Sequence, residues 1–250
     1  MNRLLIVSLL LVIACTFSNR SAIAQLHGRG IELFDGQWQP ISDEKLAQFQ
    51  VRKRKLDKQT TQTCFYKAYG PLIRIETNND QGVPNGPFVW YDNRGHADSM
   101  GNYINGLREG DWYYYNDSFK VDRKNRYANG LLVDSKDYRA ERNLPRQKDP
   151  TAVAARFDDV PGSWGVFLNK TLRYPAVAIK NNIQGNVYLR FVLDENGQVT
   201  EPWIQKSVDI SLDDESLRII KLTPAWIPAE KDGKAIKSFM LQPISYRLQD

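Results

Sequence analysis

The pattern of apolar and polar positions in residues 174–248 predicts a helix end, a hairpin, a second helix and a last long strand, with turn residues at nearly every junction. Within this segment, Tyr188 and Arg190 alternate with apolar neighbours, as the residues of a half-buried strand do. The run 194–197 ends in Asn-Gly, which tolerates the positive φ angle of a tight turn. A return strand is therefore expected at 199–206, so that this part of the chain forms a β-hairpin.

A helix is expected after this hairpin. Ser211 is a suitable N-cap, and three acidic residues follow it in positions that favour the positive end of the helix dipole. Pro224 is expected to end the helix. The three acidic residues are Asp213, Asp214 and Glu215.

A last long strand is expected at 237–247, after a turn at 231–234. It contains Pro243, which has no N–H group and cannot complete a ladder on both sides. The strand is therefore predicted to lie at a sheet edge. An edge strand offers backbone groups that an extended peptide of another protein can pair with.

The middle of the chain repeats with a spacing of 24 residues. Gly82 recurs as Gly106 and again as Gly130, and aromatic positions such as Phe88 and Trp112 correspond. Each unit reads as strand, polar turn, strand and glycine-containing turn, which predicts an array of hairpins whose neighbours cover each other's apolar faces.

Aromatic residues are dense in these repeats, and their role has two interpretations. They fill the faces of strands, or they form an outward platform for protein or glycan. Tyr113, Tyr114 and Tyr115 are consecutive, so at least one of them must point away from the core.

A charged stretch, 138–154, is expected to be a linker between two domains.

The N-terminus resembles an export signal in its pattern. Arg3 precedes an apolar run, and Ala22-Ile23-Ala24 provides a cleavage site after residue 24. Two alternatives are acylation at Cys15, as in a lipoprotein, and an uncleaved anchor, for which the apolar run of 4–17 is short. Cleavage after Ala24 would leave Cys64 as the remaining cysteine, expected to be a buried apolar side chain.

Composition narrows the classes of function. The formal net charge is +5, and without residues 1–24 the chain has 32 basic and 29 acidic residues, a net charge of +3. This balance gives no reason to expect nucleic-acid binding. His27 and His96 belong to no cluster with metal-ligand spacing, and no phosphate loop, dinucleotide motif or nucleophile elbow is present. We therefore expect no catalytic residue, metal or cofactor, and a protein that is not an enzyme.

Residues 157–248 resemble the C-terminal domain of TonB, a periplasmic protein that contacts outer-membrane transporters. The resemblance rests on the order and spacing of Pro161-Gly162-Ser163-Trp164, Phe167-Leu168-Asn169-Lys170, Tyr174-Pro175 and the hairpin, helix and strand described above. It implies two helices on a three-stranded antiparallel sheet. It also implies that a partner strand pairs with the last strand, with Ser238, Phe239, Met240, Leu241 and Gln242 as the contact segment.

The repeats resemble MORN repeats in their bacterial variant form, through the segments 85–92 and 109–116. The sequence thus predicts an α+β protein in four parts: a signal or anchor segment (1–24), a MORN-like hairpin array (28–137), a charged linker (138–154) and a TonB-like domain (155–250).

Three functions are consistent with this organisation. The first is an exported adaptor in the periplasm or envelope of a Gram-negative bacterium, which binds an outer-membrane transporter or another envelope protein. The second is a scaffold whose array binds peptidoglycan, glycan or protein while the TonB-like domain only docks, to the wall or to a second copy. The third is an energy transducer that reaches an inner-membrane proton-channel complex through an uncleaved leader. The sequence departs from this third class because it has no Pro-rich spacer. Homodimerisation through edge strands is left open.

Overall fold

The computed structural model describes residues 30–141, 149–157 and 162–248. The export signal expected at 1–24, with Cys15 and Ala24, lies outside the described residues, as do His27 and part of the expected linker.

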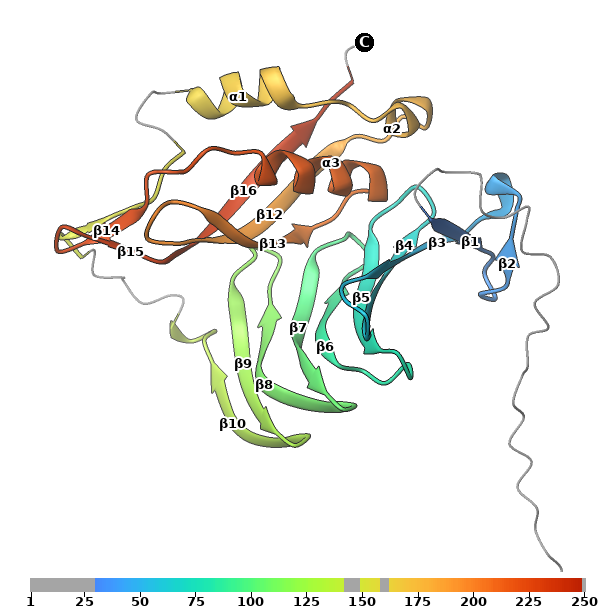
Figure 1. Cartoon of the computed structure of the whole chain (residues 1–250), viewed down its shortest axis with the longest axis horizontal. Helices are drawn as coiled ribbons and strands as arrows, with labels where there is room; N and C mark the ends of the chain where they lie inside the picture. Colours follow the sequence, from blue (N-terminus) through green and yellow to red (C-terminus); the bar gives the residue numbers. More distant parts are fainter. Residues whose placement is uncertain (1–29, 142–148, 158–161, 249–250) are drawn as a thin grey trace, which may run out of the picture.

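The N-terminal part of the described chain is one antiparallel sheet of ten strands, which we call the hairpin array (Figure 1). Its strand order is β10-β9-β8-β7-β6-β5-β4-β3-β1-β2, so that nearly every strand pairs with its neighbour in sequence. The strands are β1 (Ile31–Phe34), β2 (Pro40–Ile41), β3 (Phe49–Lys55), β4 (Thr60–Lys67), β5 (Leu72–Asn79), β6 (Gly86–Tyr91), β7 (Ala97–Ile104), β8 (Leu107–Tyr115), β9 (Val121–Ala128) and β10 (Leu131–Asp137).

Two kinds of turn alternate along the array and explain the spacing of 24 residues. At one end, Asn-Gly pairs at 105–106 and 129–130 close two-residue turns with positive φ at both positions. At the other end, Asp92 and Asn116 begin longer turns, in which the Oδ1 atom of each accepts two backbone N–H bonds from its own turn.

A row of aromatic side chains covers one face of the array. Trp112 is almost completely buried, with ring contacts to Trp90, Tyr103 and Tyr127. The guanidinium of Arg108 lies 4.5 Å from its ring centroid. The hairpins join edge to edge in one continuous sheet and do not stack face to face. The expectation that each hairpin covers the apolar face of its neighbour is therefore corrected. Instead, the aromatic side chains on one face of the sheet cover one another.

The three consecutive tyrosines do not all point to one face of the sheet. Tyr114 lies on the same face as Trp112, beneath Arg123. Tyr115 points to the opposite face, where it contacts Met100 and Trp203. All three are half-buried. Cys64 is buried, as expected.

The C-terminal sheet has three antiparallel strands in the order β13-β12-β16. Its central strand β12 (Gly185–Leu193) lies between β13 (Val199–Lys206) and β16 (Ser238–Tyr246). The described chain has three helices against this sheet, where two were expected: α1 (Ser163–Thr171), α2 (Ala176–Lys180) and α3 (Ile210–Lys221).

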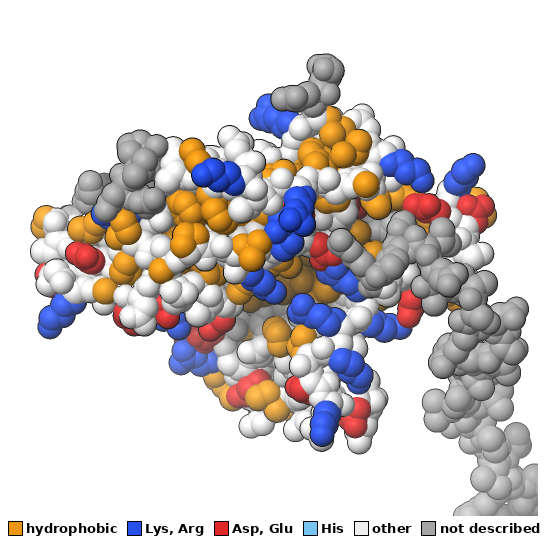
Figure 2. Space-filling model, turned by 45° about the horizontal axis from the view of Figure 1, so that its top comes forward, with side chains coloured by type: hydrophobic (Ala, Val, Ile, Leu, Met, Phe, Trp, Pro, Cys, Tyr) orange, Lys and Arg blue, Asp and Glu red, His pale blue; other side chains and the backbone are white. Residues whose placement is uncertain are grey.

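The helices cover one face of this sheet, and α3 supplies most of the contact. Leu212, Ile219 and Ile220 of α3 are fully buried with apolar residues of β12. The N-cap of α3 is Asp209, whose side chain accepts from the Ser211 N–H, so the expected cap at Ser211 is two residues too late. Helix α1 has no fully buried residue, and apolar side chains gather on the surface of this helical layer (Figure 2).

A second small sheet lies beside the first, in the order β11-β14-β15. It contains β11 (Ala152–Val153), β14 (Ala229–Lys231) and β15 (Lys234–Ile236). Strand β11 falls within the stretch expected to be a linker and pairs with β14. The expected turn at 231–234 joins β14 to β15, with positive φ at Asp232 and Gly233.

Candidate binding edge of the C-terminal sheet

The C-terminal sheet has two edge strands, β13 and β16, on either side of β12. An edge strand presents backbone N–H and C=O groups that are unpaired unless something covers them. The surroundings of these two edges decide which of them can accept another chain.

The hairpin array covers the C-terminal end of the β13 edge. The Tyr91 hydroxyl donates to the Ile204 carbonyl oxygen at 2.8 Å, and the Ser207 N–H donates to the Gly95 carbonyl oxygen at 2.9 Å. His96 and Lys206 form an isolated β-bridge between the same two segments. Gly95 has a positive φ of 80°, and a Cβ atom there would lie 2.4 Å from the Ser207 carbonyl oxygen, so this close approach requires glycine.

A buried polar network strengthens this junction. The Leu72 N–H donates to Ser207 Oγ at 2.8 Å, and Ser207 Oγ donates to Asp213 Oδ2 at 2.6 Å. Burial raises the pKa of Asp213 to about 8, against the effect of its hydrogen bonds from Ser207 and Val208. Arg52 of the array pairs with Asp214 on the next position of α3.

The β16 edge is different, because β12 is its only strand partner among the residues that the structure describes. Ser238–Tyr246 pair with Leu193–Gly185 in an unbroken antiparallel register, and Pro243 lies opposite Tyr188. The prediction that the last strand is an edge strand is therefore confirmed.

The two halves of β16 differ in how they are held. The C-terminal half is anchored: Ile244 and Tyr246 are buried, and the Tyr246 hydroxyl lies 2.9 Å from Ser216 Oγ of α3. In the N-terminal half, Phe239 is 75% exposed and Leu241 is 37% exposed.

The five predicted contact residues lie in a row along this half-strand. Phe239 and Leu241 point to one face of the sheet, opposite Val192 and Arg190 of β12. Ser238, Met240 and Gln242 point to the face covered by helices, where Met240 packs against the core. The structure thus places all five on the open edge, and their role in binding stays a prediction.

Residues 170–248, which include α2, β12, β13, α3 and β16, match the family model described as the Gram-negative bacterial TonB protein C-terminal. This segment is a TonB-like domain. The family is one of non-enzymatic energy transducers, and the TonB-like domain indicates a protein of the Gram-negative envelope with a part in transport.

Among solved structures, the chain is similar to the NMR solution structure of the Helicobacter pylori TonB C-terminal domain (residues 179–285). The two sequences are 24% identical, the match covers 34% of this chain and 78% of that chain, and the TM-score is 0.28. No curated protein matches the chain. None of the helices within the described ranges is both long and apolar enough to cross a membrane.

One cluster of side chains near the TonB-like domain was not predicted from the sequence. His96 was expected to stand apart from any ligand-spaced group, but the structure brings it together with Asp92 and Asp117. The spacing of 24 residues between repeats could have predicted this cluster, because equivalent turns of successive repeats, 92–96 and 116–120, lie side by side in the array. Burial lowers the pKa of His96.

Proposed function

We propose that this protein is an exported, non-enzymatic adaptor, in which the TonB-like domain binds an outer-membrane transporter or another envelope protein by strand addition along the outer side of β16. The observation that supports this proposal is the asymmetry of the C-terminal sheet. The hairpin array contacts the C-terminal end of the β13 edge, and no strand of the described chain pairs with the outer side of β16.

Strand addition takes its affinity from backbone hydrogen bonds and its selectivity from the side chains beside them. Phe239 and Leu241 offer exposed apolar surface to every second residue of an incoming strand. The segment 237–247 contains Lys237 and Arg247 and no acidic residue, so the edge favours a partner that is neutral or acidic.

Deletion of the last strand is a poor test, because Ile244 and Tyr246 belong to the core. The better change is the double substitution Phe239→Glu and Leu241→Glu, which alters only exposed positions of the edge. A matched control is Ile104→Glu and Leu107→Glu, two exposed apolar positions at a turn of the hairpin array.

The measurement is a pull-down from envelope extracts with the full chain as bait, followed by identification of recovered outer-membrane proteins. We expect the wild-type chain and the control to recover the same transporter, and the Phe239/Leu241 variant to lose most of it. Equal recovery by all three proteins would rule out the β16 edge as the binding surface.

The scaffold function has one observation in its favour. The outermost strand of the array, β10, has no buried residue and exposes Leu131, Leu132 and Val133. Binding to peptidoglycan or another envelope component through this strand would be abolished by Leu132→Glu and unaffected by the Phe239/Leu241 variant. Sedimentation with purified peptidoglycan, together with the pull-down, separates the two functions.

Contact with an inner-membrane proton-channel complex depends on an uncleaved leader. N-terminal mass measurement of protein isolated from its native envelope tests this directly. A mature protein that begins near Met1 would support energy transduction, and one that begins at Gln25 would support the adaptor.

A further inference from the structure

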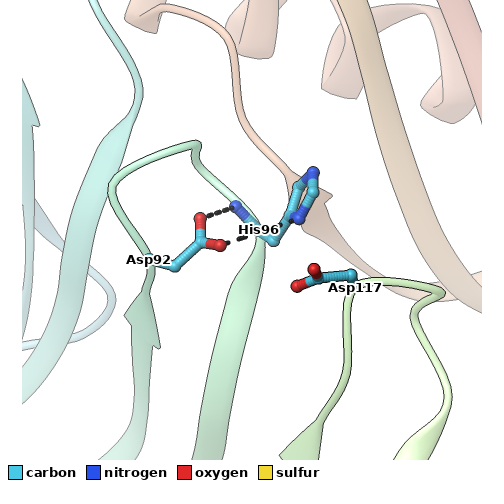
Figure 3. Close-up of side chains that lie close together, drawn as sticks. All are labelled: Asp92, His96 and Asp117. Atoms are coloured by element: carbon cyan, nitrogen blue, oxygen red, sulfur yellow. Dashed lines mark hydrogen bonds and ion pairs between the residues drawn. The ribbon is translucent and has the colours of Figure 1, made fainter.

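Three potential metal ligands meet at the junction between the hairpin array and the TonB-like domain. One ligand atom from each of Asp92, His96 and Asp117 lies within 4.8 Å of the others. Figure 3 shows the two carboxylates directed toward the imidazole ring from two separate turns.

The repeat itself produces this arrangement. Asp92 and His96 begin and end one turn of the array, and Asp117 lies in the corresponding turn of the next hairpin. The side chain of Asp92 fixes the first turn, since its Oδ1 atom accepts the N–H bonds of Arg94 and His96, at 2.8 and 2.9 Å. The other carboxylate oxygen, Oδ2, faces the ring and accepts hydrogen bonds from the Arg94 guanidinium.

The imidazole presents a nitrogen that has no hydrogen-bond partner. Nδ1 of His96 is shielded from solvent and makes no hydrogen bond within the described part of the chain. It lies 3.7 Å from Asp92 Oδ2. Two ligands of one tetrahedral zinc ion, each about 2.1 Å from the metal, are about 3.4 Å apart, so these two atoms already have nearly the required separation.

The positively charged Arg94 side chain pairs with both carboxylates of this cluster, where a metal ion would otherwise bind. Its Nη2 atom lies 2.9 Å from Asp92 Oδ2 and 2.5 Å from Asp117 Oδ1. The Arg94 side chain is 55% exposed and the Asp117 side chain 70% exposed. Ion pairs this exposed contribute little to stability, so a divalent ion can displace the guanidinium into solvent without disturbing the fold.

We propose that Asp92, His96 and Asp117 bind a divalent transition-metal ion of the zinc type. One imidazole nitrogen and two carboxylate oxygens are ligands that Zn²⁺ accepts, and water completes the coordination. The ion fastens together two turns that both hold the TonB-like domain, since Gly95 bonds to Ser207 and the Phe119 carbonyl oxygen accepts from Arg190.

The test is a titration of the metal-free full chain with Co²⁺, which gives visible d–d absorption when nitrogen and oxygen ligands surround it, followed by displacement with Zn²⁺. We expect one ion to bind per chain. Asp117→Asn and His96→Gln each lower the affinity at least about tenfold, the scale on which metal sites respond to altered ligation. Arg94→Gln, which removes the competing guanidinium, raises it. Asp80→Asn, an exposed carboxylate elsewhere in the array, is the control and leaves it unchanged.

A second measurement is the midpoint of thermal unfolding. Zn²⁺ should raise it for the wild-type chain and for Asp80→Asn, but not for Asp117→Asn, whose exposed side chain can change without loss of folding. The proposal is overturned if no stoichiometric Co²⁺ spectrum appears, or if Asp117→Asn binds the ion as tightly as the wild-type chain does.

Discussion

Asp213 shows how a single buried carboxyl group can make the stability of the protein depend on pH. It is fully buried at the start of α3, near Tyr66 and Tyr91 of the array and the acidic residues Asp209 and Asp214. Burial disfavours the ionised form, so the folded protein retains a proton up to about pH 8 that the unfolded chain releases near its ordinary pKa of 3.8.

The free energy of unfolding should therefore fall as the pH rises from about 4 to about 8, because the folded state binds more protons than the unfolded state in this window. One such proton corresponds to a slope of about 1.4 kcal/mol per pH unit. The substitution Asp213→Asn keeps the shape of the protonated carboxyl and removes the titration. We expect it to flatten the slope and to make the protein more stable than the wild type at pH 8.

Denaturant unfolding of both proteins at pH 5, 6, 7 and 8 gives these slopes. Asp80→Asn, an exposed carboxylate, should behave as the wild type does. A slope that is the same in the Asp213→Asn variant would show that Asp213 is ionised in the folded protein.

At the scale of single elements, the array depends on close contact between β7 and β8. The indole of Trp112 lies directly over Gly101, and a Cβ atom at that position would be 2.3 Å from the ring. Gly101 is thus required for space, and the ring in turn holds the aromatic row together.

The substitution Gly101→Ala should displace Trp112 and destabilise the protein by about 1–3 kcal/mol, the usual cost of overpacking. Denaturant unfolding would show the loss, and a red shift of tryptophan fluorescence would show exposure of the indole. The matched control is Gly165→Ala in α1, where the new methyl group meets open space and should be neutral or stabilising. Equal effects of the two substitutions would contradict the proposed contact.

Secondary-structure elements that are determined by residues within their own segment could be predicted from the sequence. The hairpin of β12 and β13 and the edge position of β16 follow from Asn196-Gly197 and Pro243, which act on their own backbone. Helix α3 was expected to begin two residues late, because Asp209 and Ser211 are both suitable caps and only the observed geometry distinguishes them. Strand β11 was missed because two residues carry no periodicity, and its pairing with β14 depends on a partner far along the chain.

At the scale of the whole molecule, the array and the TonB-like domain share one continuous hydrophobic core. Its two sides are joined by contacts between distant residues, such as Tyr91 with Ile204 at a separation of 113 and Arg52 with Asp214 at 162. The sequence could not predict these contacts, because no local pattern records which strand edge another module will cover. For the same reason, the sequence predicted that β16 is an edge strand but not that the array contacts the end of the opposite edge strand, β13.

Because of this shared core, the described part of the chain should unfold in a single cooperative transition. The substitution Arg52→Glu places two negative charges together at the junction, next to Asp214. We expect it to lower the midpoint of unfolding and to separate the array and the TonB-like domain into two transitions.

Differential scanning calorimetry measures both effects. Lys55→Glu makes the same change of charge at an exposed position of the same strand, and it should leave a single transition near the wild-type temperature. If the two variants unfold alike, the Arg52–Asp214 pair does not couple the modules.

The closed side of the C-terminal sheet also limits stoichiometry. A sheet whose two edge strands are both unpaired can add strands at either edge, and sheets that grow in this way form fibrils. Because the array contacts the C-terminal end of β13, a strand that runs the full length of this edge cannot be added there, and under the proposed function growth of the sheet stops after one addition to β16. Under the proposed function, a partner segment and a second copy of the protein compete for the β16 edge, so that this edge binds one strand at a time.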